Sequence, residues 1–339
     1  MPVQCLHAKS LQEVYMKKSL LFVVCVFLAL APTAFAVGQA EVAPQAAIET
    51  ADAYPQVVVD DQGTTITLES KPERILSVML MTDEILLALA EKRSLIGVSS
   101  FCQDPAVSNV AALVFDIPNK VVLNVELFIS LEPDLIFVGD WTEAESVEQL
   151  RQAGLTVFVV KTPTTIAGIR QAIVNIGEVI GQQAKAQEIV SWMDDRLRFV
   201  GEKVAALPQS ERLSVMDYGV WGDAMGSGST WDEIIQNAGL INAVGHITAD
   251  QWGRVPISKE KLIEIDPDIL VLPGWVYNDP GGPDAFFTQV ISDPAFRDLK
   301  AVQNESVFRL PESHRSTTSQ YIVYGVEDLA RLAYPDLFK

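Results

Sequence analysis

The sequence predicts an α/β protein in which two Rossmann-like lobes with parallel sheets are joined by a long rigid helix. The main observation is an internal repeat: ELFISLEPDLIFVGDW (126–141) aligns without a gap to EKLIEIDPDILVLPGW (260–275), and LSVM occurs at 76–79 and again at 213–216. Two matches in the same order and at nearly the same offset indicate two related lobes. Apolar runs such as ILVL at 269–272 are typical of parallel strands that are covered on both faces.

Strands and helices alternate through the first half, which predicts a parallel sheet with right-handed crossovers. A hairpin at 57–68 comes first, around the turn Asp61-Gln62-Gly63. A loop at 79–82 is expected before the first helix, with Thr82 as its N-cap. The expected strands are at 75–78, 95–98, 135–138 and 156–160, and the expected helices are at 83–90, 125–131 and 143–153.

Residues 165–207 have a helical pattern almost throughout, with an interruption near Gly181 and an end at Pro208. The part at 188–206 alone would be about 30 Å long at 1.5 Å per residue. A helix of this length between two lobes favours a rigid connection with limited closure.

The second half repeats the alternation. Its Gly-rich loop at 217–228 precedes a helix that Ser229 or Thr230 would cap. Pro267 ends the helix of the repeat, because proline cannot extend it. The expected strands are at 213–216, 269–272 and 306–310, and the expected helices are at 231–238, 286–299 (broken) and 321–332, with a Pro- and Gly-rich loop at 277–283.

The N-terminus has the pattern of a secretory signal peptide. Met16-Lys17-Lys18 precedes an apolar run at 20–30, too short for a bilayer span of about 20 residues, and Ala34-Phe35-Ala36 forms the cleavage site. We therefore expect cleavage after Ala36, the alternative being a retained anchor. Cys25 lies too early for a lipoprotein cysteine, so a free, soluble periplasmic protein is expected. The expected segments are a signal peptide at 1–36, a flexible tether at 37–56, an N-terminal lobe at 57–165, a helical segment at 166–208 and a C-terminal lobe at 209–339.

Composition indicates a globular protein, with 49% hydrophobic and 20% charged residues. The formal net charge of −19 argues against nucleic acid and anionic lipid as partners. Cys102 is the one cysteine after Ala36, so the mature chain cannot form an intramolecular disulfide. We expect it to be a partly buried, inert thiol rather than a ligand thiolate.

Ligands of parallel α/β sheets bind beyond the carboxyl ends of the strands. Trp141, Trp221 and Trp275 fall in loops at such ends, and aromatic walls suit a flat or bulky organic ligand. The alternative is that these tryptophans seal the strand ends as core. The loops that the rule selects are at 79–82, 99–102, 140–141, 218–223, 275–277 and 311–315.

Signatures of catalysis are weak. GSGST at 226–230 lacks the lysine and spacing of a P-loop and is better explained as a helix cap, and no G-x-S-x-G elbow occurs. Only His246 and His314 follow Ala36, which excludes a three-histidine zinc site and leaves few candidates for a Ser-His-Asp triad. We expect no enzyme, no catalytic residue and no resident metal or cofactor. An exported hydrolase acting between the lobes is the alternative of another class.

Glu126 and Glu260 are equivalent in the repeat, and both begin a helix, where an acidic side chain interacts favourably with the helix dipole. One such glutamate in each lobe would also present a symmetric pair of charges to a two-fold partner.

Five segments together resemble the periplasmic substrate-binding proteins of ABC importers for iron-siderophores, haem and cobalamin, of the class III type with a helical backbone between the lobes. They are PERILSVMLMTDEILLALAEKRSLIGVSSFC, NVELFISLEPDLIF, GSGSTWDEIIQNAGLINAV, ISKEKLIEIDPDILVL and YGVEDLARLAYPDLF. The resemblance implies a ligand held between the lobes with little domain motion. It also implies that Glu126 and Glu260 dock on arginines of a permease dimer, which works with an ATPase.

The same resemblance suggests ligand contacts. Haem-binding members use Met, Tyr or His as axial ligands. Tryptophan cannot ligate iron, but Met79, Met81, Tyr218 and His314 keep haem open. Siderophore binders often use Arg with Tyr or His, for which Arg254, Tyr218, Tyr277, His314 and Arg315 could serve. Cobalamin binders use aromatic walls, which this chain also has. We expect a monomeric receptor for a ferric siderophore or a related metal chelate, with cobalamin or haem as alternatives and no membrane insertion after cleavage. The expected ligand-binding residues are Met81, Phe101, Trp141, Tyr218, Trp221, Arg254, Trp275, Tyr277, His314 and Arg315.

Overall fold

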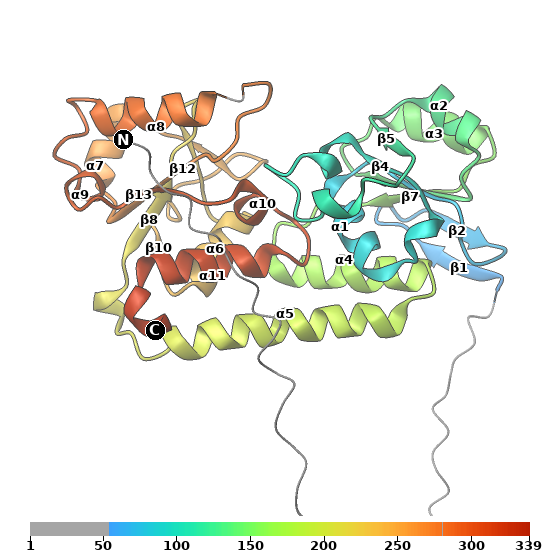
Figure 1. Ribbon diagram of the computed structural model, residues 1–339, viewed down its shortest axis with the longest axis horizontal. Helices are drawn as coiled ribbons and strands as arrows, with labels where there is room; N and C mark the ends of the chain where they lie inside the picture. Colours follow the sequence, from blue (N-terminus) through green and yellow to red (C-terminus); the bar gives the residue numbers. More distant parts are fainter. Residues whose placement is uncertain (1–53, 280) are drawn as a thin grey trace, which may run out of the picture. The chain divides into compact units, whose positions relative to one another are not determined.

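The computed structural model describes residues 54–279 and 281–339. The expected signal peptide, its cleavage site after Ala36 and most of the expected tether lie outside the described residues. Within the described part the chain forms two α/β lobes with parallel sheets and a long helix, as the repeat predicted (Figure 1).

The N-terminal lobe contains a five-stranded sheet in the order β5-β4-β3-β6-β7, with every neighbouring pair parallel. The short strand β5 was not predicted. An antiparallel hairpin precedes the sheet and bonds to its edge, because the Asp61 amide donates to the Val159 carbonyl at 3.0 Å. The strands are β1 (Gln56–Val59), β2 (Thr65–Leu68), β3 (Ile75–Ser77), β4 (Leu95–Ser99), β5 (Asn119–Val121), β6 (Leu135–Gly139) and β7 (Val157–Val160), and the helices are α1 (Leu80–Leu89), α2 (Val125–Leu131) and α3 (Ala144–Gln152).

The C-terminal lobe contains a four-stranded parallel sheet in the order β10-β8-β12-β13. A second, antiparallel pair of strands, β9 and β11, was not predicted, and β9 lies within the expected Gly-rich loop. The strands are β8 (Ser214–Asp217), β9 (Asp223–Met225), β10 (Ile241–Asn242), β11 (Arg254–Pro256), β12 (Ile269–Leu272) and β13 (Val307–Arg309). The helices are α6 (Thr230–Asn237), α7 (Lys259–Ile265), α8 (Gly282–Ser292), α9 (Lys300–Gln303), α10 (Glu312–Arg315) and α11 (Ile322–Ala333).

The repeat has the same local structure in both lobes. Helices α2 and α7 each span seven residues, and each ends on an acidic residue in the left-handed region, Glu132 and Asp266, both with φ of 47°. The Asp134 carboxylate then accepts from the Arg74 amide just before β3, and the Asp268 carboxylate accepts from the Ser214 amide at the start of β8. Equivalent side chains therefore fasten equivalent strands, which confirms the duplication.

Each sheet is covered on both faces, as the uninterrupted apolar strands predicted. In the N-terminal lobe, Leu76 and Val138 pack with Phe128 of α2 on one face, while Ile75 and Phe137 belong to a different cluster on the other. The strands of the C-terminal lobe divide in the same way between the cluster of Leu270 and that of Val271.

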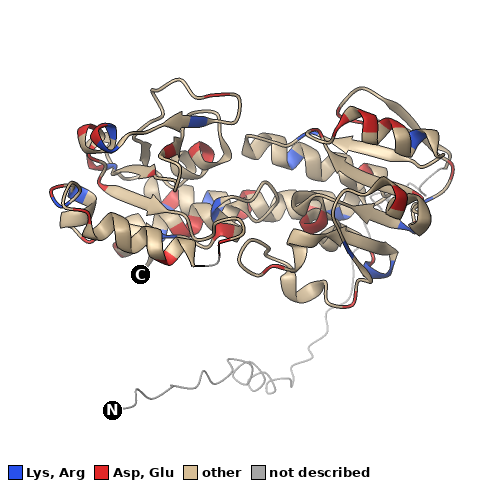
Figure 2. Cartoon of the chain, turned by 90° about the horizontal axis from the view of Figure 1, so that it is seen from above, with Lys and Arg blue, Asp and Glu red and all other residues tan. Residues whose placement is uncertain are grey.

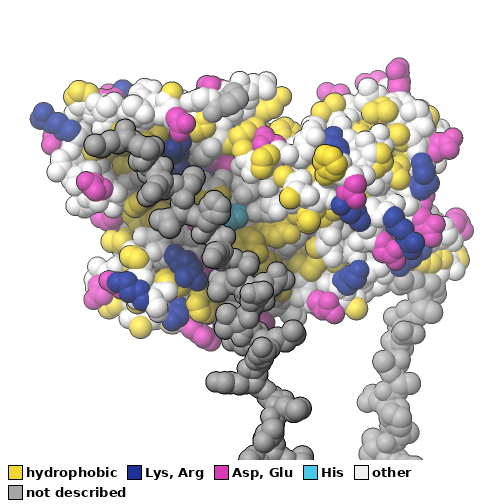
Figure 3. Space-filling view, in the orientation of Figure 1, with side chains coloured by type: hydrophobic (Ala, Val, Ile, Leu, Met, Phe, Trp, Pro, Cys, Tyr) yellow, Lys and Arg dark blue, Asp and Glu magenta, His cyan; other side chains and the backbone are white. Residues whose placement is uncertain are grey.

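The two lobes share one of these clusters. It includes buried side chains of α4 (Ile166–Val179), of α5 (Gln183–Val204) and of α6 and α11. Helix α5 has 22 residues and is about 33 Å long. In the view of Figure 3, apolar side chains gather where the lobes meet above this helix. A continuous core supports the rigid connection that the sequence predicted; the exact lobe bounds stay a prediction.

Two loops expected at the ligand edge are helical. Helix α1 begins at Leu80 rather than Asp83, with Met79 as a cap that lacks a side-chain bond. The Thr82 hydroxyl donates to the Met79 carbonyl at 2.9 Å from inside the first turn, so Thr82 is not the N-cap. The expected loop at 311–315 likewise contains the single turn α10. In contrast, Ser229 caps α6 as predicted, accepting from the Asp232 amide.

Candidate ligand-binding site

Aromatic side chains from the two lobes meet between them. Phe101 follows β4 in the N-terminal lobe, and its ring lies 6.4 Å from Trp275 and 6.3 Å from Tyr277, which follow β12 in the C-terminal lobe. Trp275 and Tyr277 are 5.9 Å apart. Phe101 and Tyr277 are exposed, so the three rings form an accessible aromatic surface between the carboxyl ends of two sheets. A notch separates the lobes at the upper edge in Figure 3.

Two further tryptophans lie at strand ends and are open to solvent. Trp141 follows β6 and is 54% exposed, and Trp221 lies between β8 and β9 and is 72% exposed. A Cβ atom added to Gly139 would lie 2.3 Å from Nε1 of Trp141, so the indole rests directly on that glycine. These two tryptophans do not seal the strand ends as core, which was the alternative.

Trp221 borders an open hollow of about 480 Å³ beside the β9–β11 pair. The Arg254 guanidinium lies 5.6 Å from the centre of the Trp221 ring and 3.3 Å from the Asp223 carboxylate. Its positive charge is therefore already paired. The lining residues are Trp221, Gly222, Asp223, Thr248, Ala249, Asp250, Arg254 and Pro256.

A second hollow of the same volume lies in the N-terminal lobe, at the end of the sheet where the strands begin. Its lining includes Glu73 before β3, Arg93 before β4 and Gln182 between α4 and α5. This hollow borders the amino ends of the strands, whereas ligands of parallel sheets bind at the carboxyl ends. We therefore do not assign it to the ligand.

Two of the expected ligand residues lie beneath the surface. Tyr218 is buried, stacked at 5.9 Å on Phe286 and edge-on at 6.3 Å to Phe296, and burial raises the pKa of its phenol. Met81 is buried in the core with Ile85 of α1. In this arrangement neither side chain reaches the aromatic surface.

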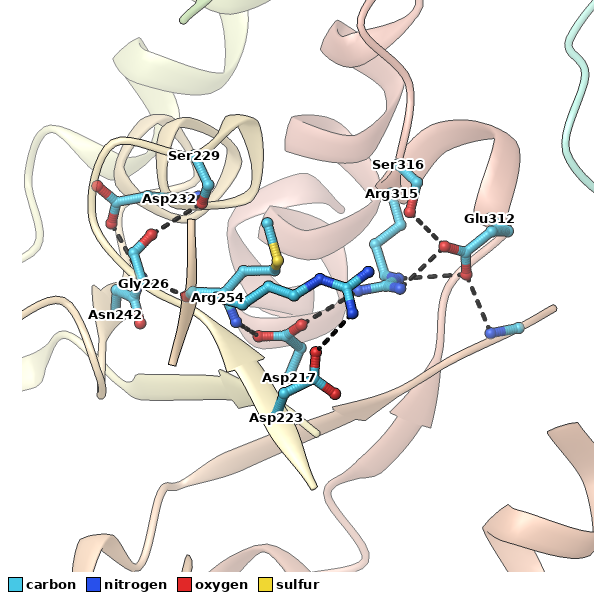
Figure 4. A network of polar contacts seen from close by, with 12 residues as sticks. Asp217, Asp223, Gly226, Ser229, Asp232, Asn242, Arg254, Glu312, Arg315 and Ser316 are labelled. Carbon is cyan, nitrogen blue, oxygen red and sulfur yellow. Dashed lines mark hydrogen bonds and ion pairs between the residues drawn. The ribbon is translucent and has the colours of Figure 1, made fainter. Parts of the chain in front are cut away.

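Arg315 is half-buried, in an ion-pair network of the C-terminal lobe (Figure 4). Its guanidinium lies 3.3 Å from the Asp217 carboxylate and donates to Glu312 at 2.9 and 3.2 Å. Glu312 also accepts from the Gly274 amide at 3.2 Å. Because Asp217 ends β8, Gly274 follows β12 and Glu312 follows β13, this network ties together the ends of three neighbouring strands.

Burial and charge act against each other in the network. Burial raises the pKa of Asp217, and the Arg315 charge only partly offsets this effect. Burial also opposes ionisation of Glu312, but the charge and hydrogen bonds of Arg315 outweigh it and lower the pKa of Glu312. Arg315 is thus a structural cation whose positive charge is compensated.

The His314 side chain contacts helix α11 and does not face the aromatic surface. Its Nδ1 lies 2.6 Å from the Asp328 carboxylate, and its ring lies 5.2 Å from Tyr324. The expected site residues therefore divide into two groups. Phe101, Trp141, Trp221, Arg254, Trp275 and Tyr277 are at least partly exposed at or near strand ends, whereas Met81, Tyr218, His314 and Arg315 are buried or bound to the protein itself.

A polar junction between the lobes was missed by sequence reasoning. The Glu84 carboxylate accepts from the Asn109 amide at 2.8 Å and from the Thr317 hydroxyl at 3.1 Å, and its carbonyl accepts from Gln320 at 2.9 Å. Asn109 also donates to the Ser313 carbonyl at 2.7 Å. Donors from the segment after α10 thus bind helix α1 of the other lobe, and local sequence patterns carry no signal for such contacts.

Cys102 and Asp83 are buried next to this junction. Cys102 is fully buried, where a partly buried thiol was expected. Burial, with the nearby Asp83 and Glu84 charges, raises the pKa of its thiol, which favours the protonated form. Burial raises the pKa of Asp83 to about 7, although the Ser77 and Ser99 hydroxyls act in the opposite direction. In residues 54–279 and 281–339, no group of three or more His, Cys, Asp or Glu side chains is placed to hold a metal ion.

Comparison with known proteins agrees with this geometry. A sequence model of the periplasmic binding protein family matches residues 75–314. The chain is 26% identical over 296 residues to a substrate-binding lipoprotein of an ABC transporter from Bacillus subtilis, with 85% of this chain and 88% of the relative aligned. It is 29% identical over 259 residues to a cobalamin-binding protein from Halobacterium salinarum, with 74% of this chain and 68% of the relative aligned.

Solved structures share the fold. The molybdate-binding protein MolA of Haemophilus influenzae has a TM-score of 0.70 at 18% identity, with 84% of this chain and 92% of MolA covered. At this identity the likeness concerns the fold alone. No helix in the described part of the chain has the length and hydropathy needed to cross a bilayer.

Proposed function

Because the chain belongs to the periplasmic binding protein family and is the substrate-binding receptor of an ABC importer, we propose that its cargo is a cobalamin-type metal chelate. The family consists of binding proteins, so the hydrolase alternative is set aside. Ser229 of the GSGST segment caps α6 and donates to the Gly226 carbonyl, as the helix-cap interpretation of that segment predicted.

The observation that carries this proposal is an aromatic surface between the lobes, together with the ion pairing of the two arginines expected to bind the ligand. Phe101, Trp275 and Tyr277 offer ring faces between the lobes, while Arg254 and Arg315 are both paired with carboxylates. Acidic residues occur in both lobes (Figure 2), and they outnumber basic residues across the chain, 44 to 25. Such a surface disfavours a strongly anionic chelate and suits a bulky, uncharged one.

The alternatives have less support. For a ferric siderophore, the resemblance implied contacts from arginine with tyrosine or histidine. The ion pairs of Arg254 and Arg315 weaken that expectation. Haem needs an axial ligand, and the expected candidates Met81 and Tyr218 are buried while His314 is bound to Asp328. The cobalamin-binding relative adds independent support.

A calorimetric titration with separate ligands tests the cargo. The mature protein would be titrated with cyanocobalamin, haemin, a ferric hydroxamate and a ferric catecholate. We expect saturable one-site binding of cyanocobalamin and at least about tenfold weaker binding of the other three, a difference of about 1.4 kcal/mol or more. Tight binding of a siderophore without binding of cobalamin would overturn the choice of cargo and leave the receptor role intact.

The importer partner is a permease with its ATPase, and we propose that Glu126 and Glu260 dock on it. Both side chains are exposed in the first turn of equivalent helices, whose N-caps Asn124 and Ser258 accept from backbone amides at 2.9 and 3.1 Å. Hydrogen bonds from the backbone and from Ser258 lower the pKa of Glu260, so it is charged at neutral pH. Reversing both charges should block uptake and leave ligand affinity unchanged; lost affinity would refute the docking role.

We also propose export to the periplasm, with cleavage after Ala36 and a free monomeric product. The basic residues, apolar run and Ala34-Phe35-Ala36 site support this proposal. The relative from Bacillus subtilis is a lipoprotein. Intact-mass spectrometry of the secreted chain distinguishes the two forms: a mature N-terminus at Val37 supports the proposal, and a lipid-modified cysteine contradicts it.

A further inference from the structure

Helices α2 and α7 share a second exposed feature beside their glutamates. Ile129 is 41% exposed and its repeat equivalent Ile263 is 43% exposed. The residue before each isoleucine, Phe128 in α2 and Leu262 in α7, is fully buried. The two helices therefore keep the same inner anchor and the same outer isoleucine, although their lobes differ at many other positions.

Each isoleucine lies three residues after the docking glutamate of its helix. Residues three apart on a helix are neighbours on one face, with about 5–6 Å between their Cβ atoms. Phe128, two residues after Glu126, falls on the opposite side, and it is buried. Glu126 with Ile129, and Glu260 with Ile263, thus each form an exposed acidic–apolar pair on the outer face of a seven-residue helix.

Single exposed apolar residues are common and by themselves mean little. Ile129 and Ile263 differ from such residues because they occupy equivalent positions in the two lobes. They also have nearly the same exposure, and each has an acidic neighbour on its helix. A neighbouring position shows that such agreement is not automatic: Leu127 of α2 corresponds to Lys261 of α7, which is ion-paired with Glu264 at 3.0 Å. Figure 1 shows α2 and α7 in different lobes, so the pattern occurs once in each.

We propose that Ile129 and Ile263 are a second pair of docking contacts for the permease dimer. Each permease subunit would present a basic side chain to the glutamate and, one helical turn away, an apolar pocket to the isoleucine. A two-fold partner meets equivalent surfaces on the two lobes, which explains why the pair is duplicated. This inference rests on the docking role proposed for Glu126 and Glu260.

Binding to the purified permease–ATPase complex in nanodiscs tests the inference, with the full mature chain. Ile129→Ser with Ile263→Ser should weaken binding by at least about tenfold, because buried apolar anchors carry much of the energy of an interface. The salt dependence should stay that of wild type, because the glutamates are intact. Glu126→Gln with Glu260→Gln should instead weaken binding and make it less sensitive to salt.

Matched controls separate docking from folding. Val59→Ser with Ile241→Ser also removes one exposed β-branched side chain from each lobe, but from β1 and β10, and should leave permease binding unchanged. Cyanocobalamin affinity and thermal unfolding should be the same in all three double variants, since exposed substitutions change stability by about 0.5 kcal/mol or less.

The outcomes distinguish this inference from the proposed function. If the isoleucine variant binds like wild type while the glutamate variant is weakened, the apolar contacts are refuted and the acidic docking sites stand. If neither variant is weakened, the docking surface itself is refuted, and the isoleucine contacts with it. Equal weakening by the control variant would also overturn the assignment to α2 and α7.

Discussion

The Arg315 guanidinium donates to both carboxylate oxygens of Glu312, at 2.9 and 3.2 Å, in a part of the C-terminal lobe where Glu312 is buried and Arg315 is half-buried. Such a two-pronged pair fixes orientation as well as distance. Glu312 extends the connection to the Gly274 amide, one residue before Trp275. The ion pair therefore positions the loop that contributes an aromatic ring to the space between the lobes.

Replacing Arg315 by methionine should destabilise the protein. The variant leaves Asp217 and Glu312 buried without their cation, and removal of one partner of a buried pair costs about 3–5 kcal/mol. Urea denaturation would measure this loss. Arg315→Lys keeps the charge but loses the paired geometry. Its free energy of unfolding should therefore lie between those of the wild type and the methionine variant. A methionine variant as stable as wild type would contradict the structural role.

Truncating Phe101 should weaken ligand binding more than it affects folding. The ring is 42% exposed and contacts Trp275 and Tyr277 from the other lobe. We expect Phe101→Ala to lower cobalamin affinity by about tenfold, or about 1.4 kcal/mol. Calorimetric titration checks the affinity, and Phe115→Ala, at a position that is 93% exposed, provides the control. An unchanged affinity would remove Phe101 from the site.

Adding a methyl group at Gly139 should displace Trp141. The added Cβ would lie 2.3 Å from Nε1 of the indole. This distance is a steric clash, so the ring must move. Trp141 is exposed and has room to do so. We expect Gly139→Ala to change the tryptophan emission spectrum. We also expect it to lower cobalamin affinity, as Trp141→Ala should. Wild-type emission and affinity in Gly139→Ala would contradict this arrangement.

Asp83 should make stability fall as pH rises through neutrality. Its pKa is raised to about 7 in the folded state, against about 3.9 in an unfolded chain, so between these values the folded state binds more protons. The contribution of Asp83 is complete below about pH 4 and is lost as pH rises through about 7, with a slope of at most about 1.4 kcal/mol per pH unit.

Asp83→Asn should flatten this dependence. Urea denaturation at a series of pH values would compare the variant with wild type and with Asp116→Asn, in which an exposed carboxylate is replaced. Part of the slope should persist, because burial also raises the pKa of Glu84. A variant with the full wild-type slope would show that Asp83 is ionised in the folded protein throughout this range.

The sequence predicted those parts of the fold that local patterns determine. Helices α2 and α7 and the strands after them follow from the repeat, and the interruption at Gly181 follows from one glycine with φ of 64°. The β9–β11 pair was missed because its strands are three residues each and their partners are about thirty positions apart. The exact start of α1 was missed because no side-chain cap marks it.

The site was predicted less completely, because strand-end loops can be identified from sequence but the direction of their side chains cannot. Trp141 and Tyr218 both follow parallel strands; the first is exposed and the second is stacked on Phe286 in the core. The Glu84 junction depends on partners that are 25 and more than 230 positions away. Adjacent acidic residues on a helix ordinarily indicate a solvated face, so no local pattern predicts a buried contact there.

Oxidative footprinting of the mature protein, with and without cyanocobalamin, tests most directly whether cargo is captured between the duplicated lobes. If the cargo is held there, the ligand protects Phe101, Trp275 and Tyr277 together and leaves the 93% exposed Phe115 as reactive as before. Saturable binding that leaves all three rings unprotected would contradict capture between the lobes.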